Sequence, residues 1–267
     1  MTIEDPAIER AYAATRAGRI HYVHAGDGPP VLLLHQTPRS WDEFRDVVPL
    51  LAATHHVYAM DSLGFGESFK PDHPMSIEKC GEAVIAFVDA IGLERFSLVG
   101  HHTGGIIAVE VAGNHPERID KLVLSGTTCP DGEGRHRDWP AIDTVEYASD
   151  GSHLAALYLK RASYYPPDRP DLLDRLVLDC LRVGLDRAEE GHDAVNSFKI
   201  EVPLKGIRAP TLLLCGVEDW AAYPEQDKLA SYLPGCQRVE IPGAGVPLPD
   251  HMPQAFADAV LAFLDAP

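Results

Sequence analysis

The sequence predicts an α/β protein in which a mostly parallel central sheet is flanked by helices and interrupted by an inserted helical cap. Short apolar runs alternate with amphipathic segments over most of the chain, which is typical of strand–helix units around such a sheet. This alternation stops after Ser125 and returns at Ile207. A chain of 267 residues is long enough for one large domain with a substantial core.

Seven short apolar runs predict the strands of the sheet. In chain order, they are Arg19–His24, Val31–His35, His56–Met60, Phe96–Val99, Lys121–Leu124, Thr211–Cys215 and Gln237–Ile241. Amphipathic segments lie between most of them, and a strand that is followed by a helix returns to the sheet as a parallel neighbour. We therefore expect most of these strands to be parallel.

Two helices are predicted with defined ends. The first begins at Ser76, a residue type that caps helix N-termini, and ends at Gly92. Between these ends, apolar residues recur at helical spacing. The second covers Gly104 to Asn114 and is stopped by Pro116, because proline cannot continue a helix.

The loss of alternation divides the chain into a core and an insertion. We predict a core of residues 1–126 and 206–267, with a cap over residues 127–205. The cap segment is rich in Pro, Tyr and Arg, as in its stretch YYPPDRPDLLDRL. The strand pattern resumes after it, so the cap interrupts one domain and does not separate two.

Composition excludes several classes of function. The formal charge of −17 argues against nucleic acid or an anionic membrane surface as a partner, because each contact would begin with repulsion. No apolar run approaches the roughly 20 residues that cross a bilayer, and the acidic N-terminus does not resemble a secretory signal. The five cysteines are scattered without a CxxC pair, so we expect neither disulfides nor a thiolate metal site. We therefore expect a cytoplasmic protein whose partner is a small-molecule substrate. The oligomeric state stays open between monomer and homodimer.

A Gly-x-x-x-Gly turn follows one predicted strand and opens the next helix. It reads Gly100-His101-His102-Thr103-Gly104, the strand–turn–helix context of a nucleophile elbow. At such an elbow, the residues two before and two after the central one must be nearly without side chains, so that strand and helix can cross closely. Glycine stands at both tight positions only when His102 is central, which places His102 at the nucleophile position.

With this elbow, the chain resembles the α/β-hydrolase superfamily over essentially its whole length. Four further segments resemble motifs of the superfamily. They are Leu34-His35-Gln36-Thr37-Pro38 for its His-Gly-x-Pro loop, Asp61 to Ser68 for its Asp-x-x-Gly-x-Gly-x-Ser turn, Gly216-Val217-Glu218-Asp219 for its acid turn, and Pro242-Gly243-Ala244-Gly245-Val246 for the loop that presents its histidine. The resemblance implies an α/β-hydrolase fold with an inserted cap.

Two of the three catalytic positions that the resemblance implies are changed. The nucleophile position holds His102 and the usual histidine position holds Val246, whereas Asp219 keeps the acid position. A Ser-His-Asp triad is therefore not assigned. Because imidazole is longer than a seryl side chain and valine leaves volume unfilled, we expect His102 to reach Asp219. In this hypothesis the two residues form a dyad in which His102 is the general base.

The resemblance also implies an oxyanion hole, formed by the backbone N–H groups of Thr103 and Gln36. Gln36 stands where the family has glycine. Its side chain either enters the hole, narrowing it or adding a donor, or turns outward so that only the backbone is used.

The expected activity is hydrolysis of a small carbonyl substrate without a cofactor. General acid–base catalysis and oxyanion stabilisation suit an activated ester, lactone, thioester or carbon–carbon bond. Two alternatives remain open: a lyase that uses His102 as acid and base in retro-aldol cleavage, decarboxylation or dehydration, and a noncatalytic small-molecule-binding pseudoenzyme.

Further side chains are candidates for the same pocket. A metal is a minor alternative, with His35, His102, Asp219 and His251 as ligands, but their spacing matches no zinc signature. We therefore expect no metal and no cofactor. His251 is also a reserve base, and Arg39 either binds a substrate carboxylate or forms a salt bridge. In the cap, a polar and aromatic lining is expected from His153, Tyr158, Arg161, Tyr164 and Tyr165.

Overall fold

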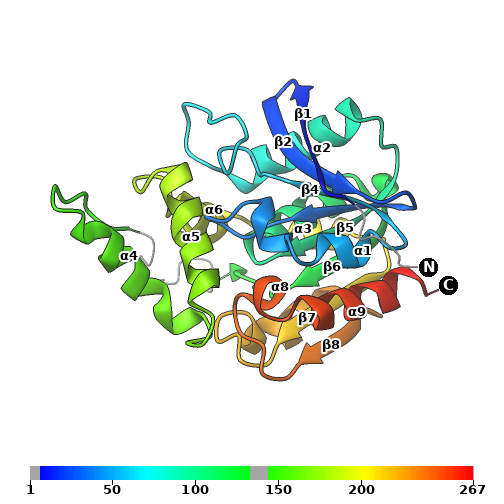
Figure 1. Ribbon diagram of the computed structural model, residues 1–267. Coiled ribbons are helices and arrows are strands. Elements are labelled where there is room, and N and C mark those ends of the chain that lie inside the picture. Colours follow the sequence, from blue (N-terminus) through cyan, green and yellow to red (C-terminus); the bar gives the residue numbers. More distant parts are fainter. Residues whose placement is uncertain (1–6, 133–143, 267) are drawn as a thin grey trace, which may run out of the picture.

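A computed structural model describes residues 7–132 and 144–266 and confirms the α/β architecture. Eight strands form one sheet in the order β1-β2-β4-β3-β5-β6-β7-β8. The β1–β2 and β2–β4 pairs are antiparallel, and the pairs from β4 to β8 are parallel (Figure 1). The carboxyl ends of the parallel strands therefore meet along one edge, where the loops of the site begin.

Seven of the strands correspond to predicted runs. They are β2 (Gly18–Ala25), β3 (Pro30–Leu34), β4 (His56–Met60), β5 (Phe96–His101), β6 (Ile119–Ser125), β7 (Thr211–Gly216) and β8 (Gln237–Ile241). The first strand, β1 (Glu9–Thr15), was not predicted. It is an edge strand with mostly exposed side chains, so it lacks the apolar run that marks the other strands.

Helices cover both faces of the sheet. Side chains of β3 alternate between two buried clusters: Leu32 and Leu34 pack with α2 and α3, and Val31 and Leu33 pack with α1 and α9. The core helices are α1 (Val48–Leu51), α2 (Ile77–Ala90), α3 (Thr103–Asn114), α7 (Gln226–Tyr232), α8 (Leu248–His251) and α9 (Pro253–Leu264). Short 3-10 helices are η1 (Trp41–Phe44), η2 (Pro116–Arg118), η4 (Ala162–Tyr164), η5 (Pro203–Gly206) and η6 (Tyr223–Glu225).

Both predicted helices are present. Ser76 caps α2, and its side chain accepts a hydrogen bond from the Lys79 N–H at 3.3 Å. The second predicted helix is α3, which begins directly after His102. No helix in the described ranges has both the length and the apolar character needed to cross a membrane.

Three α-helices lie in the described part of the insertion between β6 and β7. They are α4 (Ser152–Arg161), α5 (Pro170–Val183) and α6 (Glu190–Ser197). Helices α4 and α5 extend away from the sheet and share a small core of their own around Leu157, Leu172 and Leu176 (Figure 1). Residues 133–143 of the predicted cap lie outside the described residues, and its boundaries at 127 and 205 stay predictions.

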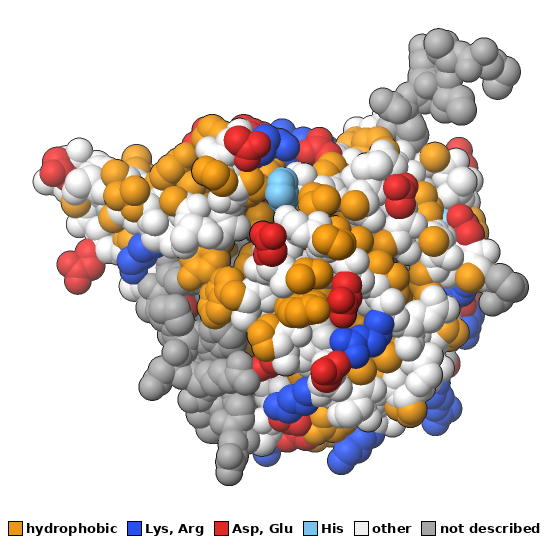
Figure 2. All heavy atoms as spheres, turned by 90° about the horizontal axis from the view of Figure 1, so that it is seen from below, with side chains coloured by type: hydrophobic (Ala, Val, Ile, Leu, Met, Phe, Trp, Pro, Cys, Tyr) orange, Lys and Arg blue, Asp and Glu red, His pale blue; other side chains and the backbone are white. Residues whose placement is uncertain are grey.

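The outer surface of these helices is partly apolar. Leu154 and Leu159 on α4 and Leu178 and Leu181 on α5 are exposed. Figure 2 shows hydrophobic side chains at the surface over this side of the molecule, with acidic and basic side chains dispersed among them.

Close backbone contacts explain the two glycines of the elbow. A Cβ at Gly104 would lie 2.0 Å from the Leu34 carbonyl oxygen, and a Cβ at Gly100 would lie 2.3 Å from the Gly104 carbonyl oxygen. Both distances are far below van der Waals contact, so neither position admits a side chain. These contacts hold the start of α3 against the end of β3.

The Asp61 motif orders a second turn at the same edge of the sheet. The Asp61 carboxylate accepts hydrogen bonds from the Trp41 N–H at 2.7 Å, the Glu67 N–H at 2.9 Å and His21 Nδ1 at 2.8 Å. A Cβ at Gly66 would lie 2.2 Å from this carboxylate. The motif therefore joins the turn after β4 to the loop after β3.

Gly104→Ala should destabilise the fold, because its new Cβ would press on the backbone of β3 and α3 would have to shift. We expect a loss of about 2–4 kcal/mol in the free energy of unfolding, measured by urea denaturation. Gly245→Ala is the control, since a Cβ there meets only the Glu218 carbonyl oxygen, at 3.9 Å. Equal unfolding midpoints for the two variants would contradict the close-approach explanation.

Candidate active site

His102 occupies a strained turn between β5 and α3. Its backbone angles are φ 47° and ψ −115°, and it is the only non-glycine residue with positive φ in the described chain. The His102 N–H donates to the Ser125 carbonyl oxygen at 2.9 Å, which ties the turn to the end of β6. Strain of this kind persists only where the surrounding structure enforces it, and it is concentrated at functional sites.

The structure brings His102 and Asp219 into contact. His102 Nε2 lies 2.7 Å from Asp219 Oδ2, with the two side chains 14% and 1% exposed. The other oxygen, Oδ1, accepts from the backbone N–H groups of Ala221 at 3.2 Å and Ala222 at 3.0 Å. The loop after β7 therefore orients the carboxylate, with one oxygen directed at the imidazole.

Gly126 provides the space for this contact. It follows β6 with φ 51°, and a Cβ there would lie 2.9 Å from His102 Nε2 and 3.0 Å from Asp219 Oδ2. Any side chain at position 126 would therefore press on both partners. The residue was not identified from the sequence, because a lone glycine after a strand reads as an ordinary turn.

A second histidine supports the elbow from behind. His101 Nε2 donates to the Val246 carbonyl oxygen at 2.9 Å, and His101 Nδ1 accepts from Ser125 Oγ at 3.0 Å. Burial, helped by the nearby charge of His102, lowers the pKa of His101 to about 3. His101 is therefore neutral and structural, and it anchors the loop that carries Val246.

Charge favours the protonated form of His102. Burial lowers the pKa of His102, but the charge and hydrogen bond of Asp219, with a contribution from Glu43, outweigh burial and raise it above its ordinary value. Burial opposes ionisation of Asp219, yet pairing with His102 and the Ala222 N–H bond lower its pKa.

The two shifts define the pH window in which the pair stabilises the fold. The pKa of His102 is higher in the folded protein than in the unfolded chain, where it is about 6.5. The contribution of His102 to folding stability is therefore complete below about pH 6.5, and it is lost as pH rises through the pKa of the folded protein. Since the folded pKa of Asp219 is lowered, its contribution is present above about pH 3.9 and is lost as pH falls through the folded pKa.

An open cavity lies above His102, and its empty space of about 760 Å³ includes the solvent at its mouth. His102 and Val246 line it from the core, together with Trp220 from the acid loop. Val246 stands where the resemblance implies a histidine, so this wall is apolar.

The inserted segment supplies another wall of the cavity. Arg161 and Tyr164 line it, as predicted, and the Arg161 guanidinium lies 5.6 Å from the centre of the Tyr164 ring. Three residues that the sequence did not single out, His192, Val195 and Asn196, line it from α6.

Other predicted lining residues lie elsewhere. His153 Nδ1 contacts the backbone of Ala148, and Tyr158 packs against the core that α4 and α5 share. Tyr165 accepts a hydrogen bond from Arg39 in a buried cluster. Predicted lining residues that are close in the sequence therefore lie in different places, because only one face of the insertion lines the cavity.

The prediction that the Gln36 N–H completes the oxyanion hole is wrong in this structure. Gln36 lines the cavity, but its backbone N–H donates to Glu43 Oε2 at 2.8 Å. Its side chain neither turns outward nor adds a donor to the hole, because Nε2 donates to Glu43 Oε1 at 2.5 Å. Glu43 is fully buried in η1, and an acid seven positions away gave no local signal of this contact.

The neighbouring residue Thr37 faces Thr103 instead. Their hydroxyl oxygens lie 3.0 Å apart, and both residues line the cavity. Neither Thr37 N–H nor Thr103 N–H donates to a described residue. Thr37 therefore replaces Gln36 as the candidate partner of Thr103.

The metal alternative finds no support in the donor geometry. His35 uses both ring nitrogens, with Nδ1 donating to the Gln36 carbonyl oxygen at 2.7 Å and Nε2 accepting from the Ser62 N–H at 2.9 Å. His251 ends α8 and does not line the cavity. Within residues 7–132 and 144–266, no three His, Cys, Asp or Glu side chains are grouped to hold a metal ion.

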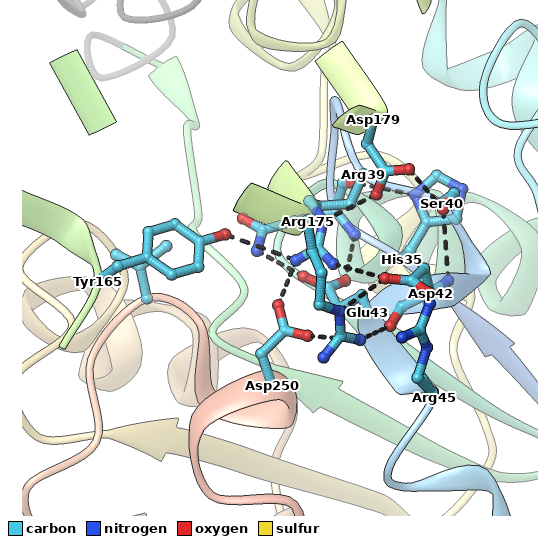
Figure 3. Close-up of polar contacts among 12 residues, drawn as sticks. His35, Arg39, Ser40, Asp42, Glu43, Arg45, Tyr165, Arg175, Asp179 and Asp250 are labelled. Atoms are coloured by element: carbon cyan, nitrogen blue, oxygen red, sulfur yellow. Dashed lines mark hydrogen bonds and ion pairs between the residues drawn. The ribbon is translucent and has the colours of Figure 1, made fainter. Parts of the chain in front are cut away.

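Arg39 lies in a buried cluster and not in the cavity (Figure 3). Its Nε donates to Asp179 Oδ2 at 2.9 Å, and Nη1 pairs with Asp250. Ser40 Oγ donates to the other oxygen of Asp179 at 2.9 Å. Of its two predicted roles, Arg39 therefore takes the salt bridge, and the structure buries that bridge completely.

The same cluster joins the insertion to the core. Asp179 and Arg175 belong to α5, whereas Asp250 belongs to α8. Arg175 Nε donates to Asp42 Oδ2 at 2.7 Å, and Arg175 Nη2 lies 3.1 Å from Asp250 Oδ1. Burial raises the pKa of Asp250 to about 6 despite the opposing charges of Arg39 and Arg175. The two arginines thus pair with three buried carboxylates of the cluster, those of Asp42, Asp179 and Asp250.

Asp219→Asn should lower the pKa of His102 to below its ordinary value of about 6.5, because burial persists while the attraction of the carboxylate is lost. NMR titration of the imidazole Cε1–H signals measures this pKa, and comparison with His102→Gln assigns the resonance. An unchanged pKa in Asp219→Asn would show that the pair does not interact in solution.

Arg39→Met should cost about 3–5 kcal/mol in the free energy of unfolding, because Asp179 and Asp250 would stay buried without their guanidinium partner. Arg95→Met is the matched control, since the Arg95–Asp120 pair is exposed and should contribute less than about 1 kcal/mol. Chemical denaturation gives both values. Similar losses would mean that the buried cluster does not hold the insertion.

Comparison with known proteins agrees with the fold. The family model described as the alpha/beta hydrolase fold matches residues 29–246. Haloalkane dehalogenase 2 of Mycobacterium tuberculosis is 28% identical over 278 aligned residues, covering 91% of each chain. Soluble epoxide hydrolase of Corynebacterium sp. is 36% identical over 106 residues, covering 40% of this chain and 37% of that one.

Solved structures show the same architecture. The enol-lactonase from Burkholderia xenovorans matches with a TM-score of 0.83 at 22% identity, over 96% of this chain and 100% of that one. An N-acyl homoserine lactone degrading enzyme matches with a TM-score of 0.76 at 24% identity, over 95% and 100%. At these identities the likeness concerns the fold alone. Since the family model spans most of the sequence and the sheet carries the elbow and acid turn at its carboxyl edge, this chain belongs to the α/β hydrolase fold family.

Proposed function

We propose that the protein hydrolyses a small carbonyl substrate without a cofactor, using His102 and Asp219 as a general-base dyad. The substrate class is an activated ester, a lactone, a thioester or a carbon–carbon bond beside a carbonyl. The observation that carries this proposal is the 2.7 Å contact between the elbow imidazole and Asp219 at the floor of the cavity.

The contact determines which imidazole nitrogen acts. Nε2–H donates to Asp219, so in the neutral ring Nδ1 carries the lone pair. A water oxygen attacks the carbonyl carbon while Nδ1 takes one water proton, and Asp219 stabilises the resulting imidazolium. When the tetrahedral intermediate collapses, Nδ1–H returns the proton to the leaving group. The Thr37 and Thr103 N–H groups are the proposed donors to the oxyanion.

The sequence relatives support hydrolysis as the type of reaction, because their names include an epoxide hydrolase and a haloalkane dehalogenase. The carbonyl substrate is our own assignment and comes from the chemistry of the site. In this chain the elbow carries an imidazole, and the proposal assigns its role to activating water instead of forming a stable covalent intermediate. A cavity partly lined by apolar side chains and closed by the insertion, which we assign as the cap, supports a small and partly apolar substrate.

A lyase is the second candidate, in which His102 at the floor of the cavity is both acid and base. The charge of Asp219 raises the pKa of His102, so the imidazole can remove a proton and deliver it again without water as nucleophile. Turnover in H₂¹⁸O separates the two, because hydrolysis places ¹⁸O in the product and lyase cleavage does not.

His102→Ala should lower kcat by about 10²- to 10⁴-fold, because it removes the general base. The measurement uses a panel of p-nitrophenyl acetate, a small thioester and unsubstituted lactones, with circular dichroism to show that the variant is folded. His115→Ala changes a half-buried histidine at the end of α3, away from the cavity, and is the control that should keep full activity. Wild-type turnover by His102→Ala would overturn the dyad, and binding without turnover across the panel would indicate a pseudoenzyme.

The pH profile gives a second check of the same step. Only neutral His102 accepts a proton, so log kcat/KM should rise with pH and level off above the raised pKa of His102 in the free enzyme. A rate that instead falls as this group loses its proton would assign His102 the role of an acid.

A further inference from the structure

Gln36 and His102 lie just beyond the ends of two neighbouring strands, β3 and β5. In the parallel β3–β5 pair, Leu34 is in register with Gly100. Gln36 and His102 each lie two residues beyond that pair, and adjacent strands are about 4.8 Å apart. Both residues line the same cavity. Adjacent strand ends therefore bring both residues to the same cavity.

Glu43 fixes the Gln36 amide in one orientation. Its two carboxylate oxygens accept the Gln36 backbone N–H at 2.8 Å and side-chain Nε2 at 2.5 Å. Both interactions need a donor on Gln36, so a carboxylate at position 43 selects the amide rotamer with Nε2 toward it. The carbonyl oxygen Oε1 then points away from Glu43, and it has no hydrogen-bond partner among the described residues.

Glu43 is rigid and enclosed. It is fully buried in η1, beside the equally buried Arg39. Burial raises the pKa of Glu43. The positive charge of Arg39 and the two hydrogen bonds from Gln36 oppose this shift and favour the ionised carboxylate. A carboxylate held in this way serves as a fixed double acceptor and leaves one acceptor of Gln36 for a ligand.

We propose that Gln36 and Glu43 position the hydrolytic water. The water donates one hydrogen bond to Gln36 Oε1 and the other to His102 Nδ1. A nucleophilic water has two hydrogens, and two acceptors are needed to turn its lone pair toward the carbonyl carbon. His102 takes the proton during attack, while Gln36 only orients the water and is a positioning residue. Glu43 acts through Gln36. This inference rests on the proposed hydrolysis by the His102–Asp219 dyad.

The structure explains why the second acceptor is an amide and not a carboxylate. A carboxylate in direct contact with the water would compete with His102 for its proton and would repel the developing oxyanion. The Gln36 carbonyl accepts a hydrogen bond but does not take the proton at neutral pH. The charge of Glu43 is separated from the water by one residue.

Gln36→Met tests this water-binding site, because methionine keeps the length of glutamine without its carbonyl oxygen. With p-nitrophenyl acetate as the probe, we expect kcat for hydrolysis to fall by about 10²-fold with little change in KM. Glu43→Gln should lower kcat in the same direction but less, since an amide at position 43 permits both orientations of Gln36. Gln254→Met, the same substitution at an exposed position, is the control.

Added hydroxylamine separates positioning of water from a merely structural role. Hydroxylamine attacks the ester without a base and does not need a positioned water. If Gln36 positions the water, Gln36→Met should keep the wild-type rate of hydroxamate formation while the rate of hydrolysis falls. An equal loss of both rates, or an unchanged rate of hydrolysis, would overturn the proposal that Gln36 positions the water. Should Gln36→Met fail to fold, the same two rates in Glu43→Gln decide the question. Unchanged hydrolysis by His102→Ala would instead refute the dyad, whatever the Gln36 variants show.

Discussion

The hydrogen bond between His102 Nε2 and Asp219 Oδ2 is the interaction on which the rest of the site depends. It determines the tautomer of the imidazole, leaves Nδ1 for a ligand, and raises the pKa of His102 against the effect of burial. Gly126 leaves the space for it, and Ala221 and Ala222 orient the carboxylate. In a usual triad, a separate histidine would lie between nucleophile and acid. Here the elbow residue spans that distance itself, and Val246 forms an apolar wall.

The sheet makes this arrangement possible by placing three strand ends side by side. His102 follows β5, Gly126 follows β6 and Asp219 lies beyond β7, so consecutive parallel neighbours supply the imidazole, the space and the acid. The strained turn at His102 is enforced by backbone contacts at Gly100 and Gly104. Folding energy from the two faces of the sheet therefore holds a conformation that a histidine would otherwise rarely adopt.

Local signals in the sequence predicted the parts of the protein that depend on local physics. Apolar runs indicated seven strands, and the spacing of Gly100 and Gly104 placed His102 at the turn. The exposed edge strand β1 has no such run. The contact of Glu43 with Gln36 and the burial of Arg39 between α5 and α8 were also missed, because each is decided by which distant elements meet in space. The choice of Gln36 as an oxyanion donor failed for the same reason.

The central claim is that His102 activates water and does not itself become acylated. Rapid-quench mass spectrometry of the peptide that carries His102, during turnover of an activated ester in H₂¹⁸O, tests this claim most directly. The account predicts an unmodified peptide at every time point while ¹⁸O enters the carboxylate product. An acyl adduct on His102 that forms and decays at the rate of turnover, or a product without ¹⁸O, would contradict it.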